Sequence, residues 1–237
     1  MQHGMESQIG VIDTGDMIIL KDKSKVNIQT YVDGYKTGYK KFGDFGDVII
    51  YERSGNIPVI HRAMLWLEYN SNETWSAPSL EGYPEELWSC TSGDHNNLYG
   101  ILMLNGQEIN LDNITRTSPY SGYLTKGDNN VSFDQPSNIP GVYGLISYDK
   151  IQSVAWFEVP WVGAFKMMLE GKSNTLSYWV PNTIPNISAA VILLVFMLVG
   201  IGFLFDYRYY ENIREELAEE MDAPAPLFLV ETEDRSE

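Results

Sequence analysis

One histidine and one aspartate in this sequence could form half of a hydrolytic site. His61 stands in the apolar run Ile57-Pro-Val-Ile-His-Arg62, and Asp134 follows the polar segment Leu124-Thr-Lys-Gly-Asp-Asn-Asn130. A neutral imidazole that is oriented by a carboxylate is the general base of a Ser-His-Asp triad. The two residues therefore predict acyl-transfer chemistry, provided that the fold brings them together.

Each candidate residue also has an ordinary structural explanation, and these explanations stay open at the level of sequence. His61 can be a half-buried strand residue. Asp128, between a glycine and two asparagines, can be a turn former, because its side chain can bond its own backbone. Asp134 can be a loop acid for the same reason. The spacing of His3, His61, Cys90 and His95 matches no standard ligand pattern, so we expect no metal site and no cofactor.

Five segments in a fixed order carry a resemblance to a known family. They are Gly15-Asp16 with Met17–Leu20, Gly46–Tyr51, Ile57–Arg62, Thr125–Asn130 with Asp134, and Val154–Gly163. In this order they resemble the type I signal peptidases of the archaeal and endoplasmic-reticulum branch, whose base is a histidine where the bacterial branch has lysine. The resemblance covers roughly residues 4–163, except for 67–120.

The resemblance implies a serine endopeptidase that removes signal peptides from exported preproteins. By this resemblance His61 is the general base, Asp134 the triad acid and Asp128 a supporting acid. The implied partners are signal peptides, the lipid bilayer and the secretion translocon, and no cofactor is needed. The substrate would be the extended stretch that follows a signal peptide's apolar segment, with small residues near the cleavage site.

The nucleophile departs from the family pattern. The family places a serine directly before a methionine, and here Gly4 precedes Met5. A glycine has no side chain that could attack a carbonyl. Three explanations stay open: the serine was replaced or removed by engineering, the chain is a natural non-catalytic relative, or Ser7 is the nucleophile in a shifted register. Ser7 lies eight positions before Gly15, a spacing that many relatives use, but Gln8 follows it. We favour Gly4 as the vacant nucleophile position.

Composition limits the class of partner. The 237 residues carry a formal net charge of −16, which argues against a nucleic-acid-binding protein because such a protein needs a basic face. Residues 206–237 hold eleven acids and three bases, so about half of the charge lies in this tail. Cys90 is the only cysteine and cannot form an internal disulfide.

The body of the chain predicts a mainly β fold. Short β-branched and apolar runs are separated by glycine, proline and asparagine, and no stretch has convincing helical periodicity. The expected strands are Met17–Leu20, Val26–Tyr31, Val48–Tyr51, Ile57–Met64, Tyr99–Leu104, Val142–Ile146 and Ile151–Val159. Residues 67–120, with Trp75 and Trp88, are expected to form an inserted lobe with a small aromatic core, to which the preceding Trp66 also contributes.

An apolar segment predicts a C-terminal transmembrane helix. Ile187–Phe205 contains nineteen uncharged residues, which is close to the length that crosses a bilayer. Tyr178 and Trp179 stand before it, and three tyrosines follow it, at 207, 209 and 210. The predicted domain organisation has four parts. They are a signal-peptidase-like β domain at 1–66 and 121–183, a lobe at 67–120, a transmembrane helix at 184–206 and an acidic tail at 207–237. Arg208 and Arg214 favour a cytoplasmic tail and an external body in the cell membrane. The body either hangs from this helix alone or has lost an N-terminal anchor.

A second class of function fits the same composition. A β domain outside the membrane, anchored by one helix, also describes a receptor or adhesion module, and a signal-peptidase relative that binds without cutting is a third possibility. Under the binding-module interpretation His61 and Asp134 need not be neighbours. The distance between these two side chains therefore discriminates the hydrolase from the adhesion module.

Overall fold

The computed structural model describes residues 10–70, 72–135, 142–172 and 183–222. Gly4 and Ser7 lie outside these residues, as do the last fifteen residues of the predicted tail. The chain divides into two compact units, Met1–Pro185 and Asn186–Glu237, and each is described by itself.

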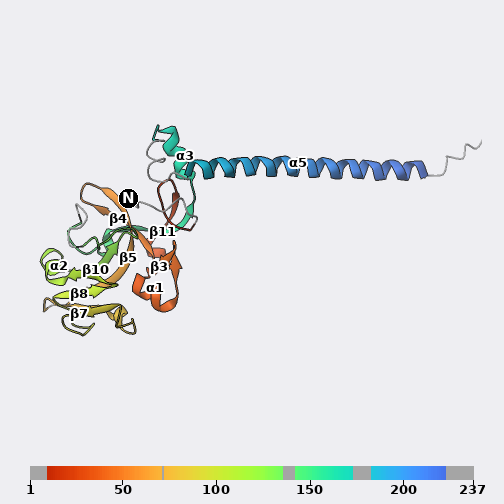
Figure 1. The fold of residues 1–237 in the computed structure, drawn as a ribbon. Helices are drawn as coiled ribbons and strands as arrows, with labels where there is room; N and C mark the ends of the chain where they lie inside the picture. Colours follow the sequence, from red (N-terminus) through yellow and green to blue (C-terminus); the bar gives the residue numbers. More distant parts are fainter. Residues whose placement is uncertain (1–9, 71, 136–141, 173–182, 223–237) are drawn as a thin grey trace, which may run out of the picture. The chain divides into compact units, whose positions relative to one another are not determined.

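The first unit is built on one antiparallel sheet, whose strand order is β1-β11-β4-β5-β10 (Figure 1). The central strand is β5, which pairs with β4 on one side and with β10 on the other. A short strand, β6, pairs with the end of β5. The bounds are β1 Met17–Asp22, β4 Val48–Arg53, β5 Ile57–Tyr69, β6 Trp75–Ser76, β10 Gly122–Lys126 and β11 Ile151–Val159.

Two smaller pieces of sheet accompany the main one. One has three strands, β7 (Trp88–Cys90), β8 (Ile101–Leu104) and β9 (Gln107–Asn110), in the order β7-β8-β9. The other is the hairpin of β2 (Lys40–Lys41) and β3 (Asp44–Phe45). The described residues of the body are thus rich in β structure, as the sequence predicts.

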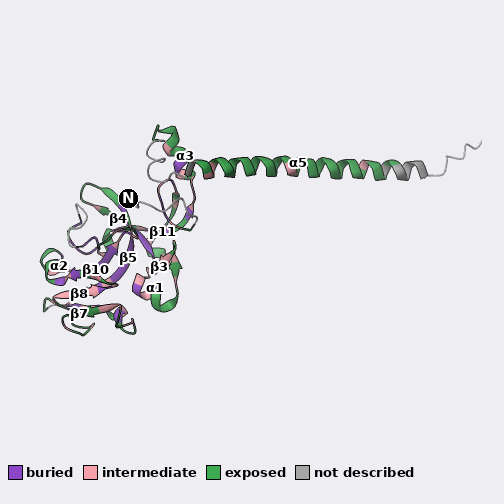
Figure 2. Ribbon diagram, in the orientation of Figure 1, coloured by how far each residue is buried: buried purple, intermediate pink, exposed green. Residues whose placement is uncertain are grey.

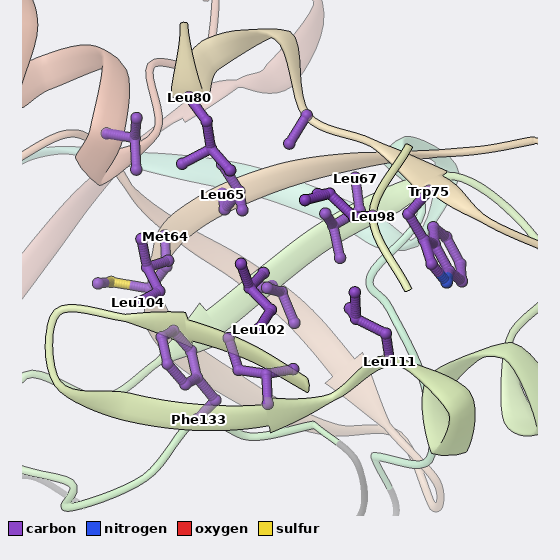
Figure 3. Packing of buried hydrophobic residues seen from close by; sticks show 14 of the residues in the cluster. Met64, Leu65, Leu67, Trp75, Leu80, Leu98, Leu102, Leu104, Leu111 and Phe133 are labelled. Carbon is purple, nitrogen blue, oxygen red and sulfur yellow. The ribbon is translucent and has the colours of Figure 1, made fainter. Parts of the chain in front are cut away.

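The core of residues 67–120 is continuous with the core of the main sheet. Figure 3 shows Leu65 and Leu67 of β5 packed with Leu98, Leu102 and Trp75 in one cluster. All five side chains are fully buried. The buried aromatic residues Trp75 and Tyr83 of this region thus belong to a larger, mainly aliphatic cluster that includes residues of β5.

Within the described residues, three short α-helices were not predicted from the sequence. They are α1 (Tyr31–Thr37), α2 (Leu111–Thr117) and α3 (Val162–Leu169). α1 begins with a capping box, in which the Thr30 side chain accepts from the backbone of Asp33 and the Asp33 side chain accepts from Thr30, and it ends at Gly38 with φ 77°. Two turns are too short for a period of 3.6 residues to show.

Two expected strands are wrong. Val26–Tyr31 is not a strand, because Thr30 caps α1 and Tyr31 is its first residue. Val142–Ile146 contributes only an isolated bridge between Ile146 and Tyr123. By contrast β11 has the expected bounds Ile151–Val159.

After β11 the chain turns sharply into α3. Trp161 adopts φ 63°, and its backbone N–H donates to Asp16 Oδ1 at 3.0 Å. The N–H of Ala164 donates to the carbonyl of Gly15 at 2.7 Å. A Cβ on Gly163 would lie 2.6 Å from the carbonyl oxygen of Asp16, so only glycine permits this approach. The Gly15-Asp16 turn thereby fixes α3 against the start of β1.

The second unit is formed by one long helix, α5 (Thr183–Asp222), whose side chains between 188 and 215 are nearly all exposed (Figure 2). The stretch Pro185–Glu215 has a mean hydropathy of 2.8 in its most apolar window and is long and apolar enough to cross a membrane. The predicted helix at 184–206 is therefore a helix of suitable length and composition. It continues to Asp222, so the first part of the acidic tail is helical as well.

Candidate active site

Strand register decides which way His61 points. In the β4–β5 ladder His61 lies opposite Ile49, and Val59 lies opposite Tyr51. Side chains alternate along a strand, so His61, Val59 and Ala63 share one face of β5 while Arg62 points to the other. In the β5–β10 ladder Ala63 lies opposite Thr125, which places Thr125 on the face of His61.

Asp134 is carried to this face by the segment that follows β10. Its backbone N–H donates to the carbonyl of Thr125 at 2.9 Å. The Gln135 side chain accepts from the N–H of Thr125 at 2.9 Å and donates to its hydroxyl at 3.0 Å. These three bonds fix Asp134 beside β10, where its side chain is fully buried.

His61 and Asp134 form a hydrogen-bonded pair. Nδ1 of His61 lies 2.7 Å from Oδ2 of Asp134. The His61 side chain is 11% exposed, so one part of the ring still reaches the surface. The sequence placed these residues on separate motifs, and the structure brings them together.

Two hydroxyl groups hold the same carboxylate oxygen. Thr125 Oγ1 donates to Oδ2 of Asp134 at 2.6 Å, and the phenol of Tyr51 donates to it at 2.8 Å. Burial, followed by the charge of Asp134, raises the pKa of Tyr51, so the phenol keeps its proton and is a donor. Oδ1 of Asp134 is buried and has no hydrogen-bond partner among the described residues. Both hydroxyl groups therefore act on Oδ2, the oxygen that His61 contacts.

The second nitrogen of His61 faces the turn after β10. A Cβ built on Gly127 would lie 2.9 Å from Nε2 of His61, closer than real Cβ contacts. Among the described residues Nε2 makes no hydrogen bond. An imidazole with Nδ1 on a carboxylate and Nε2 unbonded has the geometry of a general base.

A small depression lies beside the imidazole. Its lining combines apolar and polar side chains, from Ile12, Val48, Ile60, His61, Arg62 and Asp128. Its volume is only about 10 Å³, so an extended peptide would lie across it and not inside it. Val48 of β4 and Ile60 of β5 provide apolar lining, and β5 also carries His61.

Asp128 contacts Arg62 and not His61. Its two carboxylate oxygens accept from Nε of Arg62 at 2.8 Å and from an Nη at 2.6 Å. The Arg62 side chain is fully buried and also donates to the carbonyls of Gly46 and Lys41. Asp128 thus holds the 127–130 turn against Arg62, and within the described residues it makes no hydrogen bond to His61, so its role as a supporting acid stays a prediction. Lys126 lies opposite Arg62 in the ladder, away from His61, and burial lowers its pKa.

The N-terminal segment approaches the same depression. Gly10 is the first described residue, and its N–H donates to Oε1 of the buried Glu158. Two residues later Ile12 lines the depression beside His61. Gly4 and Ser7, the two candidate nucleophile positions, lie outside the described residues.

Three further residues of the site were not identified from sequence: Tyr51, Thr125 and Gly127. Thr125 and Gly127 stand inside the turn motif, yet the motif alone does not reveal that the threonine holds Asp134. Tyr51 ends the Gly46–Tyr51 segment, and only the β4–β5 register reveals that it reaches the carboxylate. Within the described residues no three His, Cys, Asp or Glu side chains could jointly hold a metal ion.

Comparison with known proteins identifies no relative. No protein-family model, no curated protein and no solved structure matches the chain. The case for a function therefore stands on the geometry of His61 and its neighbours and on the resemblance of the sequence motifs.

Proposed function

We propose that this chain is a membrane-anchored serine endopeptidase of the signal-peptidase type, with His61 as general base and Asp134 as its orienting acid. The observation that supports this most is the 2.7 Å contact between Nδ1 of His61 and Oδ2 of Asp134. A receptor or adhesion module has no need for a buried carboxylate aligned with an imidazole whose other nitrogen makes no hydrogen bond to any described residue.

The proposed proton transfers follow from this contact. A serine hydroxyl oxygen attacks the scissile carbonyl carbon while Nε2 of His61 takes the hydroxyl proton. The tetrahedral intermediate collapses, the C–N bond breaks, and the imidazolium returns the proton to the leaving amine. Water then hydrolyses the acyl-enzyme by the same route. Asp134 keeps the proton on Nδ1 and stabilises the imidazolium that forms twice in each cycle.

The proposed substrate is the extended cleavage region of a signal peptide. Such a segment binds by strand addition to an exposed sheet edge, and small residues near the cut allow close approach to the backbone. α5 would hold the domain at the membrane surface where this region emerges. In this proposal the body lies outside the cell membrane and the acidic tail lies in the cytoplasm.

The serine itself is the open part of the proposal. Gly4 occupies the position that the family pattern gives to the nucleophile, and Ser7 is the nearest hydroxyl in a shifted register. Because acyl transfer tolerates little misplacement, only one of these positions can serve.

The test is cleavage of a full-length precursor by the full chain in a bilayer, with the new N-terminus read by mass spectrometry. We expect the Gly4→Ser form to cleave at one position, and His61→Ala to abolish that cleavage. Ser7→Ala should leave it unchanged, and His95→Ala, a change at a half-buried turn residue, is the matched histidine control.

Other outcomes would separate the alternatives. Cleavage by the unchanged chain that Ser7→Ala abolishes would make Ser7 the nucleophile and keep the role of His61. Binding of precursor without cleavage in every form would favour a non-catalytic relative. Cleavage that survives His61→Ala would refute the proposal.

A further inference from the structure

Four triplets in the sequence have the Asn-X-Ser/Thr pattern of an N-glycosylation acceptor, and they begin at Asn72, Asn113, Asn130 and Asn186. In this pattern the asparagine side chain carries the glycan, and the hydroxyl two positions later is needed for recognition. A folded acceptor therefore needs an exposed asparagine whose side chain lies beside that hydroxyl. The four triplets differ in this respect.

Asn72 and Thr74 have adjoining side chains on the connection between β5 and β6. The hydroxyl of Thr74 donates to Oδ1 of Asn72 at 2.7 Å and accepts from Nδ2 of Asn70 at 3.2 Å. The N–H of Asn70 donates to the carbonyl of Thr74 at 2.9 Å, and Glu73 adopts φ 64°, which fixes the loop. Asn72 is exposed, and its Nδ2 makes no hydrogen bond to any described residue. The atom that would carry a glycan is therefore accessible beside the required hydroxyl.

Two of the other triplets lie in helices, Asn113-Ile-Thr115 in α2 and Asn186-Ile-Ser188 in α5. Residues two apart on a helix point in nearly opposite directions, so neither asparagine faces its hydroxyl residue. The hydroxyl of Thr115 also accepts from Nε1 of the fully buried Trp75 at 2.9 Å. Recognition of that hydroxyl by an enzyme would leave a buried indole N–H without its partner, which is costly.

The remaining triplet lies beside the candidate active site. Nδ2 of Asn130 and Nε2 of His61 each lie 2.9 Å from the point that a Cβ on Gly127 would occupy, so the two nitrogens are at most twice that distance apart. Asn130 is half-buried, and a bulky glycan on it would cover the imidazole. The loop of Asn72 is remote by comparison, because β5 runs eight residues from His61 to Tyr69, roughly 26 Å along an extended strand.

We propose that the folded protein carries an N-linked glycan on Asn72, and that the fold prevents modification of Asn113, Asn130 and Asn186. The co-reactant is a lipid-linked oligosaccharide. Nδ2 of Asn72 attacks the anomeric carbon of the first sugar, the bond from that carbon to the lipid phosphate breaks, and the lipid phosphate leaves. The amide loses one proton to a base of the transferring enzyme. In the cell this modification requires the external body proposed above, but it does not depend on the hydrolytic role of His61.

The test combines the purified full chain in detergent with a single-subunit oligosaccharyltransferase that accepts Asn-X-Ser/Thr, and with its lipid-linked oligosaccharide. We expect intact-mass spectrometry to detect the addition of a single glycan, and the modified peptide to contain Asn72. Asn72→Gln and Thr74→Ala should each abolish the addition, whereas Thr74→Ser, which keeps the hydroxyl, should retain it. The matched controls Asn113→Gln and Asn130→Gln should leave the addition unchanged.

Synthetic peptides of residues 110–116 and 127–133 should both be glycosylated, because outside the fold their triplets are accessible. Rejection of these peptides would refute the role of the fold. An unchanged chain that receives no glycan, or a glycan that persists in Asn72→Gln, would refute Asn72 as the acceptor. Because the modified residue is mapped in the unchanged chain, a variant that folds poorly does not affect the test. The assay contains no precursor and no sealed membrane, so its failure is distinct from a failure of the proposed hydrolysis or topology.

Discussion

Oδ2 of Asp134 lies 2.7 Å from Nδ1 of His61, and the same oxygen accepts hydrogen bonds from Tyr51 and Thr125. Residues 73 positions apart in sequence thus meet at one buried atom. The imidazole is held on one side by a carboxylate that is itself held by two hydroxyls. On its other side lies Gly127, whose missing side chain leaves space at Nε2.

Tyr51→Phe should lower kcat for precursor cleavage roughly tenfold, with little change in KM, because one of the three donors to Oδ2 is lost. The matched control is Tyr39→Phe, which removes a tyrosine–carboxylate bond to Asp47 that does not touch His61. Equal loss of kcat in the two variants would mean that Tyr51 acts only through general stability.

Gly127→Ala should lower kcat roughly a hundredfold while the protein stays folded. The new Cβ would lie 2.9 Å from Nε2 of His61 and 2.9 Å from Nδ2 of Asn130, so the imidazole must shift. Gly200→Ala, where a Cβ meets nothing within 4 Å, is the control. Full activity of Gly127→Ala, measured beside an unchanged melting temperature, would place the reacting atoms elsewhere.

Asp128→Asn should act on stability more than on catalysis. It removes the charge partner of the fully buried Arg62, and breaking such a pair costs about 3 kcal/mol. Chemical denaturation should detect this loss. The control Asp149→Asn, at an exposed position of the short 3-10 helix Tyr148–Lys150, should change the free energy of unfolding by less than about 0.5 kcal/mol. If Asp128→Asn instead left stability intact and abolished cleavage, Asp128 would be a catalytic acid.

Glu158 should make stability depend on pH. Burial raises the pKa of Glu158 above its usual 4.5, with Asp16 adding to the rise and the bond from Gly10 opposing it. The folded protein therefore binds this proton more tightly than the unfolded chain, and stability falls as pH rises from 4.5 through the raised value.

Glu158→Gln removes this titration and keeps an oxygen that can accept from the N–H of Gly10. Thermal melts of the full chain should find the variant more stable than the unchanged protein at neutral pH. Within about half a pH unit of pH 4, the two proteins should have similar stability. A variant that is less stable at every pH would show that the charged carboxylate is required.

Secondary-structure elements could be predicted where their sequence pattern is long, and they were missed where it is short. β11 has its expected bounds because a nine-residue run rich in β-branched and aromatic side chains ends at Pro160. α1 was missed because seven residues display no helical period, although the signs of its ends, Thr30 with Asp33 and then Gly38, are in the sequence. The packing of Leu98 and Leu102 against β5 is a long-range fact that no local pattern contains.

The residues of the site likewise include some that could be predicted from sequence and some that could not. His61 and Asp134 could be predicted because residue type and motif order suffice to select them. Tyr51 and Thr125 could not, because their orientation depends on strand register, and the β5–β10 ladder shifts by one residue between Leu124 and Thr125. A single such shift exchanges the two faces of a strand, which moves a side chain toward or away from the carboxylate.

The most direct test of the central claim is kcat for precursor cleavage by Asp134→Asn, in the form of the chain that carries its nucleophile. Asparagine is nearly the same size as aspartate but lacks the charge that keeps the proton on Nδ1 of His61. The account predicts a fall of roughly 10³–10⁴-fold in kcat with KM nearly unchanged. A value within a few-fold of the unchanged enzyme would contradict the assignment of His61 and Asp134 as base and orienting acid.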